Sequence, residues 1–287
     1  MAWIDRDGNP VPGDEGQDKM LAWLYGTGLG RGIVKLLIKP WVSRCAGKLM
    51  DSGLSRLAIK PFLKKNRINM EEYEDGPFRS FNAFFTRQIR PGKRPIDPDP
   101  AHFIAPCDSK LSVYPITADA TFRVKQTEYT LESLLRDKEL AKNYEGGLFL
   151  LFRLTVGDYH RYGYVESGQK GENRKIPGVF HTVNPAANDR YPIYKENTRE
   201  FTVIETDRCG AVLQMEVGAT MVGRIVNYHS ARQVNRGEEK GKFEFGGSTV
   251  IVCLEKDRAV IDPDILKNTA NGLETVVKFG EKIGICN

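Results

Sequence analysis

Cysteine and histidine are both scarce in this chain. Its 287 residues include five cysteines, at positions 45, 107, 209, 253 and 286, and only four histidines. No two cysteines form a Cys-x-x-Cys pair, and an odd number with wide spacing argues against a disulfide framework or a zinc knuckle. From the cysteines we therefore expect a reduced compartment, which favours the cytoplasm.

Long apolar runs and targeting signals are also missing. Residues 1–16 are acidic and contain Pro10, Pro12 and Gly13, so they lack the basic flank and apolar stretch of a signal peptide. No apolar run approaches the ~20 residues that a membrane-spanning helix needs. Repeats and low-complexity tracts are absent, and 40% hydrophobic residues are enough to bury a core. We expect a soluble or peripheral protein with one large domain and an appendage, or with two modest domains.

Positive charge is concentrated near the N-terminus. Residues 31–67 contain ten Lys and Arg residues and a single acid, Asp51, whereas the rest of the chain has 32 basic and 36 acidic residues. Apolar residues between 18 and 65 recur at spacings of three and four, which predicts two or three amphipathic helices interrupted at 26–30, Pro40 and Gly53. We interpret residues 1–75 as a basic, amphipathic helical region that associates with membranes.

Two physical interpretations of this helical region remain open. Apolar side chains opposite a Lys/Arg face suit a helix lying on an anionic membrane surface, where each basic residue contributes about 1 kcal/mol. A helix pair packed on the core, with a solvated basic face, would have the same pattern. The region has no recognised nucleic-acid-binding motif, so we expect no nucleic acid partner.

Strand patterns dominate the remainder, residues 76–287. The predicted fold class is α+β, with N-terminal amphipathic helices followed by a mainly antiparallel β catalytic domain. Helices are expected at 80–87 and 130–136. The predicted strands are 110–116, 148–155, 159–165, 178–183, 201–205, 211–217, 223–228 and 249–255, rich in β-branched and aromatic residues.

A Gly246-Gly247-Ser248-Thr249 segment lies between two of these strand-like runs. Glycines permit a close approach, so the Ser248 hydroxyl could attack the Gly247 carbonyl and replace the peptide bond by an ester. Elimination and hydrolysis would then leave a pyruvoyl group at a new N-terminus. By itself the segment is weak evidence, because Gly-Gly-Ser turns are common and a serine nucleophile needs a base, usually a histidine oriented by a carboxylate.

Four stretches resemble the phosphatidylserine decarboxylase family, in that family's order. They are Ser80-Phe-Asn-Ala-Phe-Phe-Thr-Arg87 running to Arg90-Pro-Gly-Lys-Arg-Pro-Ile-Asp97; Ala105-Pro-Cys-Asp-Ser109; Asp158-Tyr-His-Arg161; and Val217-Gly-Ala-Thr220 with Val222-Gly223, followed by residues 240–249. The resemblance implies a self-processing enzyme that releases CO2 from phosphatidylserine to give phosphatidylethanolamine, through a Schiff base to a pyruvoyl cofactor.

The resemblance also assigns roles to individual residues. Ser248 matches the precursor of the covalent pyruvoyl group, and cleavage after Gly247 would give a long β chain, 1–247, and a short α chain, 248–287. Asp108 matches the aspartate of the self-processing relay, and His160 matches a histidine associated with proton transfer during decarboxylation. The implied partners are phosphatidylserine, an anionic membrane surface at the cytoplasmic face and, by resemblance alone, a second copy in a homodimer. No metal is implied.

One position departs from the family pattern. Many members carry a second histidine three residues after the first, but this chain has Gly163 there. Residues 159–165 and 178–183 look like two strands of one hairpin, whose register would place His181 opposite Tyr162 or Gly163. We therefore predict that His181 fills the vacated volume and that Asp108, His181 and Ser248 form the relay.

Two other functions stay open at this point. A related pyruvoyl enzyme could decarboxylate a soluble amino acid, although the basic helical region favours a lipid substrate. A chain that has lost its relay base could also be a membrane-binding homologue that does not process itself.

Overall fold

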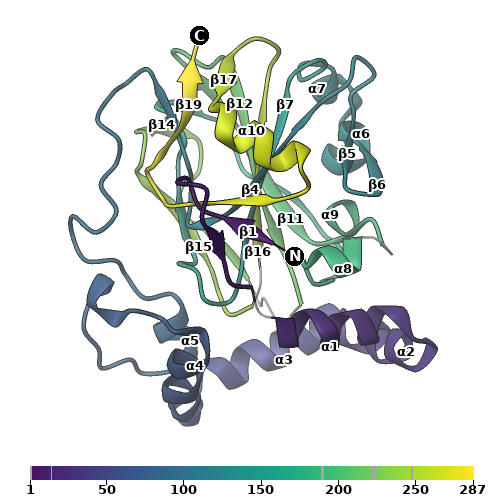
Figure 1. Cartoon of the computed structure of the whole chain (residues 1–287), viewed down its shortest axis with the longest axis vertical. Coiled ribbons are helices and arrows are strands. Elements are labelled where there is room, and N and C mark those ends of the chain that lie inside the picture. Colours follow the sequence, from purple (N-terminus) through teal and green to yellow (C-terminus); the bar gives the residue numbers. More distant parts are fainter. Residues whose placement is uncertain (1, 14, 189–190, 221–223, 247) are drawn as a thin grey trace.

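The computed structural model of the chain describes residues 2–13, 15–188, 191–220, 224–246 and 248–287, and Figure 1 shows the arrangement of its helices and strands. The helices of the described residues are α1 (Glu15–Gly26), α2 (Gly28–Leu37), α3 (Pro40–Asp51), η1 (Gly53–Ala58), α4 (Ile59–Asn66), η2 (Met70–Glu72), α5 (Phe81–Phe85), α6 (Leu131–Leu135), α7 (Lys138–Lys142), α8 (Pro185–Asn188), α9 (Ile193–Glu196) and α10 (Pro263–Ala270).

The strands of the described residues belong to four sheets. They are β1 (Trp3–Ile4), β2 (Pro10–Val11), β3 (His102–Ile104), β4 (Ser109–Pro115), β5 (Thr121–Val124), β6 (Thr127–Thr130), β7 (Leu148–Leu154), β8 (Arg161–Gly163), β9 (Gly168–Lys170), β10 (Arg174–Ile176), β11 (Arg199–Thr206), β12 (Ala211–Gly218), β13 (Ile225–Asn227), β14 (Arg232–Val234), β15 (Glu239–Phe243), β16 (Ser248–Leu254), β17 (Ala259–Ile261), β18 (Glu274–Val277) and β19 (Lys282–Cys286).

A large mixed sheet forms the centre of the molecule. Its strands follow the order β14-β9-β11-β12-β16-β7-β4-β18-β1-β2, with β10 paired to β11. Among the described ladders only β1 with β18 is parallel. Strand β16 lies in the middle, and all seven of its residues are buried because apolar layers cover both of its faces. The predicted α+β class, with N-terminal helices before a mainly antiparallel β region, is confirmed.

A second sheet, β13-β15-β8, packs on the inner face of the large one. The Gln214 side chain of β12 donates a hydrogen bond to the Gly163 carbonyl of β8 at 3.0 Å. Lys240 of β15 forms an ion pair with Glu216 of β12, and both side chains are fully buried. The space between the two sheets therefore contains charged groups as well as apolar ones.

The N-terminal helices α1 to α4, which we call the helical arm (residues 15–66), run along one end of the β region in Figure 1. The helices break where the sequence predicts: the Thr27 side chain caps α2 by accepting from the Gly30 amide, and Pro40 is the first residue of α3. Leu21, Tyr25 and Val34 are buried in the main core. The arm is therefore packed on the β region along one of its faces.

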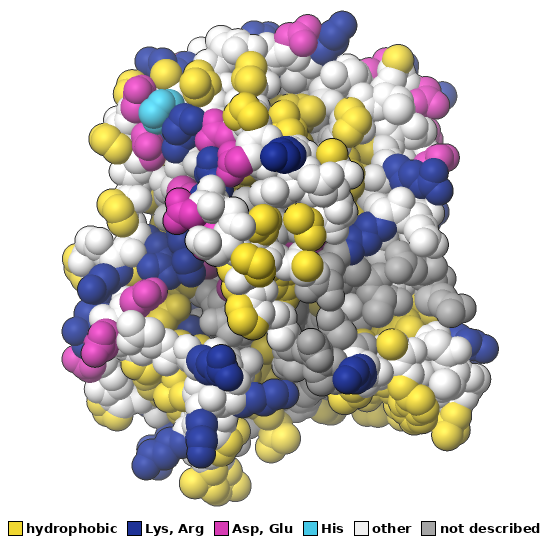
Figure 2. Space-filling view, viewed as in Figure 1, with side chains coloured by type: hydrophobic (Ala, Val, Ile, Leu, Met, Phe, Trp, Pro, Cys, Tyr) yellow, Lys and Arg dark blue, Asp and Glu magenta, His cyan; other side chains and the backbone are white. Residues whose placement is uncertain are grey.

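The opposite face of the arm is also apolar. Figure 2 shows yellow side chains and dark blue Lys/Arg side chains gathered at this end of the molecule. Exposed large apolar residues of the arm are Met20, Trp23, Leu29, Ile33, Leu36, Trp41, Leu49, Leu54 and Leu57. Among the described residues, no helix combines the length and the apolar character that crossing a membrane requires.

The predicted hairpin of residues 159–165 and 178–183 is wrong. Strand β8 pairs with β15, and residues 178–183 form no strand, with only a single bridge from Val179 to Asn197. Strand periodicity gives no information on which strand is the partner, so two neighbouring segments were paired by proximity alone. Helix α10 and strands β1 and β2, which extend the large sheet, were also not foreseen.

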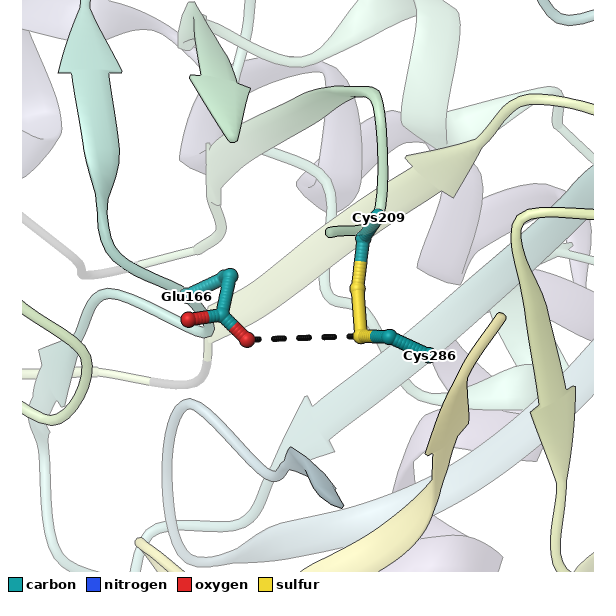
Figure 3. A group of neighbouring side chains, drawn as sticks. All are labelled: Glu166, Cys209 and Cys286. Carbon is teal, nitrogen blue, oxygen red and sulfur yellow. Dashed lines mark hydrogen bonds between the residues drawn. A yellow bond between two sulfur atoms is a disulfide. The ribbon is translucent and has the colours of Figure 1, made fainter. Parts of the chain in front are cut away.

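The cysteines also differ from the expectation that they form no disulfide. Cys209 and Cys286 form a disulfide across 77 positions of the chain, drawn with Glu166 in Figure 3. Cys45, Cys107 and Cys253 are free. Sequence spacing argued against a disulfide because the two residues lie far apart in the chain, but folding brings their Cα atoms to 5.3 Å.

Candidate functional site

Ser248 is the first residue of β16, at the end of the central strand. It pairs with Gly218 of β12 on one side and with Leu154 of β7 on the other. The residue is 0% exposed, and its Oγ has no hydrogen-bond partner among the described residues. A buried hydroxyl without a partner is costly and points to a chemical role. Ser248 therefore fits the precursor of an internal cofactor.

The segment leading into Ser248 is held in place by α5. Asn82 accepts a hydrogen bond from the Phe245 amide at 3.0 Å and donates one to Asp51 of α3 at 2.8 Å. The Phe245 ring also contacts Phe81 and Phe85, with centroids 4.9 and 5.1 Å away. Gly246 follows with a φ of +134°, which side chains rarely tolerate. The backbone before Ser248 is thus fixed in a conformation that needs glycine.

Gly247, the predicted cleavage position, lies outside the described residues. Gly246 and Ser248, on either side of it in the sequence, are described.

His160 lies beside this segment. Its ring packs against Phe85 in a tilted arrangement, with centroids 4.0 Å apart, and its backbone carbonyl accepts from the Phe243 amide at 2.9 Å. Nδ1 donates to the Asp158 carbonyl at 2.9 Å, which leaves Nε2 as an acceptor, buried and without a partner in the part of the chain that the structure describes. Burial lowers the pKa of His160 to about 3, so its imidazole is neutral at physiological pH.

Asp108 is buried and bound by cations rather than by histidine. Arg94 contacts both carboxylate oxygens, at 2.9 and 2.7 Å, and the Phe279 amide donates to Oδ1 at 2.9 Å. Lys278 approaches at 3.5 Å. The desolvation that burial imposes on Asp108 is offset by these donors, so the side chain is held in one position.

His181 has two partners of its own. Its Nδ1 lies 3.3 Å from the Tyr25 hydroxyl, and its Nε2 lies 3.2 Å from Glu196. The Tyr25 oxygen accepts from the Thr182 amide and donates to Nδ1, so Nε2 carries the proton that faces Glu196. Burial lowers the pKa of His181 to about 4. The carboxylate that pairs with this histidine is therefore Glu196, not Asp108.

The backbone of His181 nevertheless lies close to the Ser248 strand. Its carbonyl accepts from the Asn197 side chain, which also donates to the Gly218 carbonyl, each at 2.8 Å. A Cβ placed on Gly218 would be 3.0 Å from the Phe180 ring, so Phe180 covers the residue that pairs with Ser248. The structure brings the 180–181 segment to Gly218, the strand partner of Ser248, while the imidazole points to Tyr25 and Glu196.

The volume beside Gly163 is filled by Phe279. A Cβ on Gly163 would lie 2.7 Å from the Phe279 ring and 2.8 Å from the Glu238 carbonyl. The prediction that His181 fills this volume is wrong, because β8 pairs with β15 and not with residues 178–183. The same Phe279 donates its amide to Asp108. The C-terminal segment thus occupies the place next to Asp108.

A cavity of about 310 Å³ lies beside Asp108. Asp108, Arg94, Lys110, Asp158 and Lys278 contribute to its walls, together with residues 66–69 at the end of the helical arm. Lys110 and Asp158 form a buried ion pair at 2.6 Å. Burial alone would raise the pKa of Asp158, but Lys110 and Thr155 outweigh this and lower it. Neither Ser248 nor either histidine lines the cavity.

The buried pair of Glu216 and Lys240 was not foreseen from the sequence. Side chains alternate along a strand, so Ser248 shares its face of the sheet with Gly218 and Glu216 of the neighbouring strand. Lys240 also donates to Asn227 at 2.8 Å, and one Glu216 oxygen has no partner among the described residues. Burial raises the pKa of Glu216 and lowers that of Lys240. Lys240 begins the family-like stretch 240–249, but nothing in the sequence pairs it with Glu216.

Comparison with known proteins matches this chain to one family. The model of the phosphatidylserine decarboxylase family covers residues 81–285. The chain belongs to the phosphatidylserine decarboxylase family. "Phosphatidylserine decarboxylase proenzyme 2" of Clostridium acetobutylicum is 42% identical over 268 residues, which are 93% of this chain and 92% of that relative. The proenzymes of Ruminiclostridium cellulolyticum and Desulfitobacterium hafniense are 40% and 38% identical, each over 93% of this chain and over 91% and 92% of the relative.

The phosphatidylserine decarboxylase match spans every predicted site residue. Asp108, His160, His181 and Ser248 all lie within residues 81–285. Most of the helical arm precedes that range, but the relatives named above match over 93% of the chain, so their similarity extends into the arm. The similarity to this family of carboxy-lyases therefore extends along nearly the whole sequence.

Proposed function

We propose that the protein is a self-processing phosphatidylserine decarboxylase whose pyruvoyl cofactor derives from Ser248. The observation that carries the proposal is the buried Ser248 hydroxyl, which has no hydrogen-bond partner among the described residues and lies two positions after the glycine-dependent backbone at Gly246. In a member of this family, such a serine is placed for chemistry rather than for packing. The product of the proposed reaction is phosphatidylethanolamine.

The proposed cleavage proceeds in two stages. The Ser248 Oγ adds to the Gly247 carbonyl carbon and the peptide nitrogen leaves, which converts the peptide bond into an ester. A base then removes the Cα proton of residue 248, and the Cβ–Oγ bond breaks to release the Gly247 carboxylate. The remaining enamine takes up water and loses ammonia. The resulting pyruvoyl group supplies a ketone for the substrate amine and a carbonyl that takes up electrons as CO2 departs.

His160 is the proposed proton carrier for decarboxylation. Its neutral Nε2 can accept a proton as the substrate amine loses one, and can return that proton to the substrate Cα. The Phe85 ring beside it, which packs on Phe245, excludes water from this position. Its hydrogen bond to the Asp158 carbonyl fixes the tautomer that this role needs.

For self-cleavage we retain the relay of Asp108, His181 and Ser248 as a proposal. The closeness of the His181 backbone to Gly218 supports it. The relay requires His181 to exchange its contact with Tyr25 for one with Ser248, since both ring nitrogens are otherwise occupied. Glu196 would then orient the histidine. Asp108, which binds the Phe279 amide rather than the histidine, would act by holding the C-terminal segment in place.

The helical arm is the proposed membrane-binding surface, with residues 1–75 as the membrane-associating region and 76–287 as the catalytic region. Exposed leucines and tryptophans beside Lys and Arg side chains suit an anionic bilayer surface. We propose a peripheral location at the cell membrane, and a homodimer on the family resemblance; the Cys209–Cys286 disulfide argues against the cytoplasmic face that the cysteine spacing predicted, because disulfides are rare in the cytosol. Asn82 of α5, which bonds both to Asp51 of the arm and to the Phe245 amide, connects the arm to the segment before Ser248.

Replacement of Ser248 tests the proposal directly. We expect Ser248→Ala to remain a single chain and to release no CO2, because it has no hydroxyl to attack the peptide bond. Intact-mass analysis of the denatured and reduced native protein should give two pieces, divided between residues 247 and 248, the shorter reactive toward carbonyl reagents. Ser112→Ala, at a buried serine of β4, is the matched control and should be cleaved normally.

The substrate is tested by comparing CO2 release from phosphatidylserine vesicles with release from free serine and other amino acids. Preference for a soluble amino acid would reject the lipid assignment while leaving the cleavage intact. An uncleaved native chain would reject the enzymatic function altogether.

A further inference from the structure

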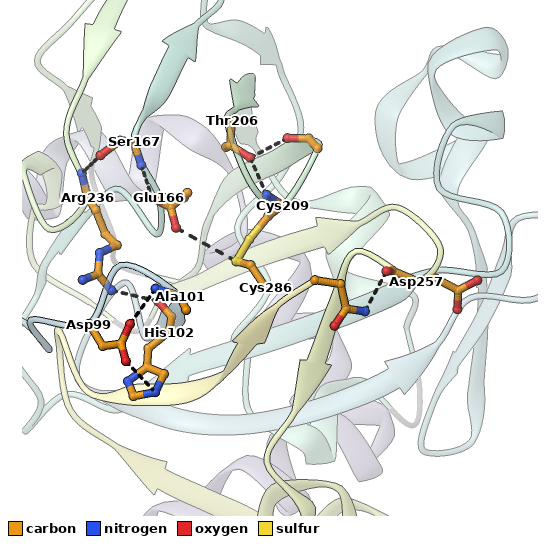
Figure 4. Close-up of a disulfide and its surroundings, with 12 residues drawn as sticks. Asp99, Ala101, His102, Glu166, Ser167, Thr206, Cys209, Arg236, Asp257 and Cys286 are labelled. Carbon is orange, nitrogen blue, oxygen red and sulfur yellow. Dashed lines mark hydrogen bonds and ion pairs between the residues drawn. A yellow bond between two sulfur atoms is a disulfide. The ribbon is translucent and has the colours of Figure 1, made fainter.

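The Cys209–Cys286 disulfide joins two distant parts of the chain. Cys209 lies in the turn between β11 and β12, and Cys286 is the last residue of β19, next to the C-terminus. The Thr206 hydroxyl accepts from the Cys209 amide at 3.0 Å, and the Cys286 amide donates to the Ala101 carbonyl at 2.9 Å. Figure 4 shows the bond enclosed by these loops and by Glu166. The bond is thus held from both sides by backbone contacts.

The proposed cleavage would fall between the two cysteines. Cys209 would remain in the piece 1–247, and Cys286 in the piece 248–287. Cys45 and Cys107 belong to the long piece and Cys253 to the short one, and all three are free. We propose that Cys209–Cys286 covalently joins the two products of self-cleavage, so that the mature protein is a disulfide-linked pair of chains. This inference rests on the proposed function.

The disulfide anchors the C-terminal end of the short piece, whereas the central strand β16 anchors its N-terminal end. At its N-terminal end, β16 pairs along its full length with β7 and over six residues with β12. At the other end, β19 is paired with β3 and β17, and β17 itself belongs to the short piece. The short piece also supplies the Phe279 amide to Asp108. Loss of its C-terminal end would therefore release a contact of the candidate site.

The Cys209–Cys286 bond can form by exchange of the two thiols with a small-molecule disulfide. The two thiols transfer two protons and two electrons to that disulfide, which departs as two thiols. When the pair is reduced, the Cys286 thiol can donate to Glu166, whose Oε2 lies 4.0 Å from the sulfur. The two sulfurs and this carboxylate offer ligand atoms within 4.8 Å of one another, so a thiophilic cation is the competing occupant of the reduced pair.

Alkylation and mass measurement test the link. Protein purified without reductant is treated with N-ethylmaleimide in denaturant and then measured with and without dithiothreitol. We expect one species near the 32.3 kDa of the whole chain before reduction, with three alkylated cysteines, and two species after it. Cys209→Ser and Cys286→Ser should each give two species without reductant, whereas Cys45→Ser, at an exposed free cysteine, should stay joined.

The outcomes separate this inference from the proposed function. Two pieces without reductant, with all five cysteines alkylated, would overturn the link and leave cleavage intact. Release of zinc on alkylation, with no disulfide, would overturn it in favour of a metal. A single chain both before and after reduction would reject the cleavage, and the link between products with it.

Refolding gives an independent measurement. Joined pieces reassociate within one molecule, so the refolding of the protomer after dilution from denaturant, a step before any association of protomers, should not depend on protein concentration. For Cys286→Ser the pieces must meet in solution, and a tenfold dilution should slow recovery about tenfold. Recovery of the native protein that slows equally on dilution would contradict the link.

Discussion

At the scale of single residues, environment separates side chains that the sequence presents alike. His160 and His181 are both buried and neutral, but Nε2 of His160 has no partner among the described residues while both nitrogens of His181 are occupied. His160 is thus ready to take a proton as it stands. His181 can act on Ser248 only after leaving Tyr25. The two histidines are therefore expected to fail in different ways when replaced.

Replacing each histidine distinguishes their roles. We expect His181→Ala to remain uncleaved, because Ser248 would lack its base, and His160→Ala to be cleaved but to lose CO2 release by at least about a hundredfold, the usual contribution of a general acid or base. Intact mass measures the first effect and vesicle assays the second. Circular dichroism confirms that each variant is folded. Normal cleavage of His181→Ala, together with an uncleaved His160→Ala, would transfer the base to His160.

At the scale of elements, the helical arm has an unusual distribution of apolar residues. Leu21, Tyr25 and Val34 bury one face against the β region. Leu54 and Leu57 of η1 are 79% and 81% exposed, although leucine is a residue that folded proteins usually bury. A simple solvated basic face would not place such side chains outward. The arm therefore fits a surface that a bilayer covers.

Introducing negative charge on this apolar surface tests its role in membrane binding. We expect the double variant Leu54→Asp and Leu57→Asp to bind phosphatidylserine vesicles at least tenfold more weakly, since each buried leucine is worth about 2 kcal/mol. Self-cleavage should continue, because neither side chain packs in the core. Val260→Asp, at an exposed apolar residue of β17 on the opposite end in Figure 1, is the control. Vesicle sedimentation measures binding, and equal binding of both variants would contradict the assignment.

At the scale of the whole molecule, burial of neutral histidines links folding to pH. Burial lowers the pKa of His160 to about 3 and that of His181 to about 4, below the value of ~6.5 in an unfolded chain. As pH falls through the window from ~6.5 to ~4, the unfolded state binds protons that the folded state does not. The stabilising contribution of each histidine is complete above this window, and it is lost progressively down to about pH 4 for His181 and down to about pH 3 for His160.

The pH dependence of unfolding tests this. We expect the free energy of unfolding to fall with pH in that window, by up to about 1.4 kcal/mol per pH unit for each histidine. In His181→Gln the free energy of unfolding should depend on pH less steeply, by the contribution of one histidine. Comparison with the native protein removes the opposing contribution of the buried carboxylates other than Glu196, because it is the same in both proteins. Denaturant unfolding at several pH values measures it. Identical slopes in both proteins would show that His181 is not buried in neutral form.

The sequence by itself determined the local features of this protein. The spacing of apolar residues and the breaks at Gly26 and Pro40 predicted the helices of the arm, and runs of β-branched residues predicted most long strands. These signals are local, because capping, proline geometry and periodicity act within a few residues. The four family stretches likewise pointed to Ser248, Asp108 and His160, and the family itself is confirmed.

Only the tertiary structure decided which distant residues meet. It paired β8 with β15, placed Phe279 rather than His181 beside Gly163, and gave His181 its partner Glu196. It also joined Cys209 to Cys286 and buried Lys240 against Glu216. Each of these contacts depends on sheet order and register, which periodicity does not encode, because any strand can pair with several others until the whole core is packed.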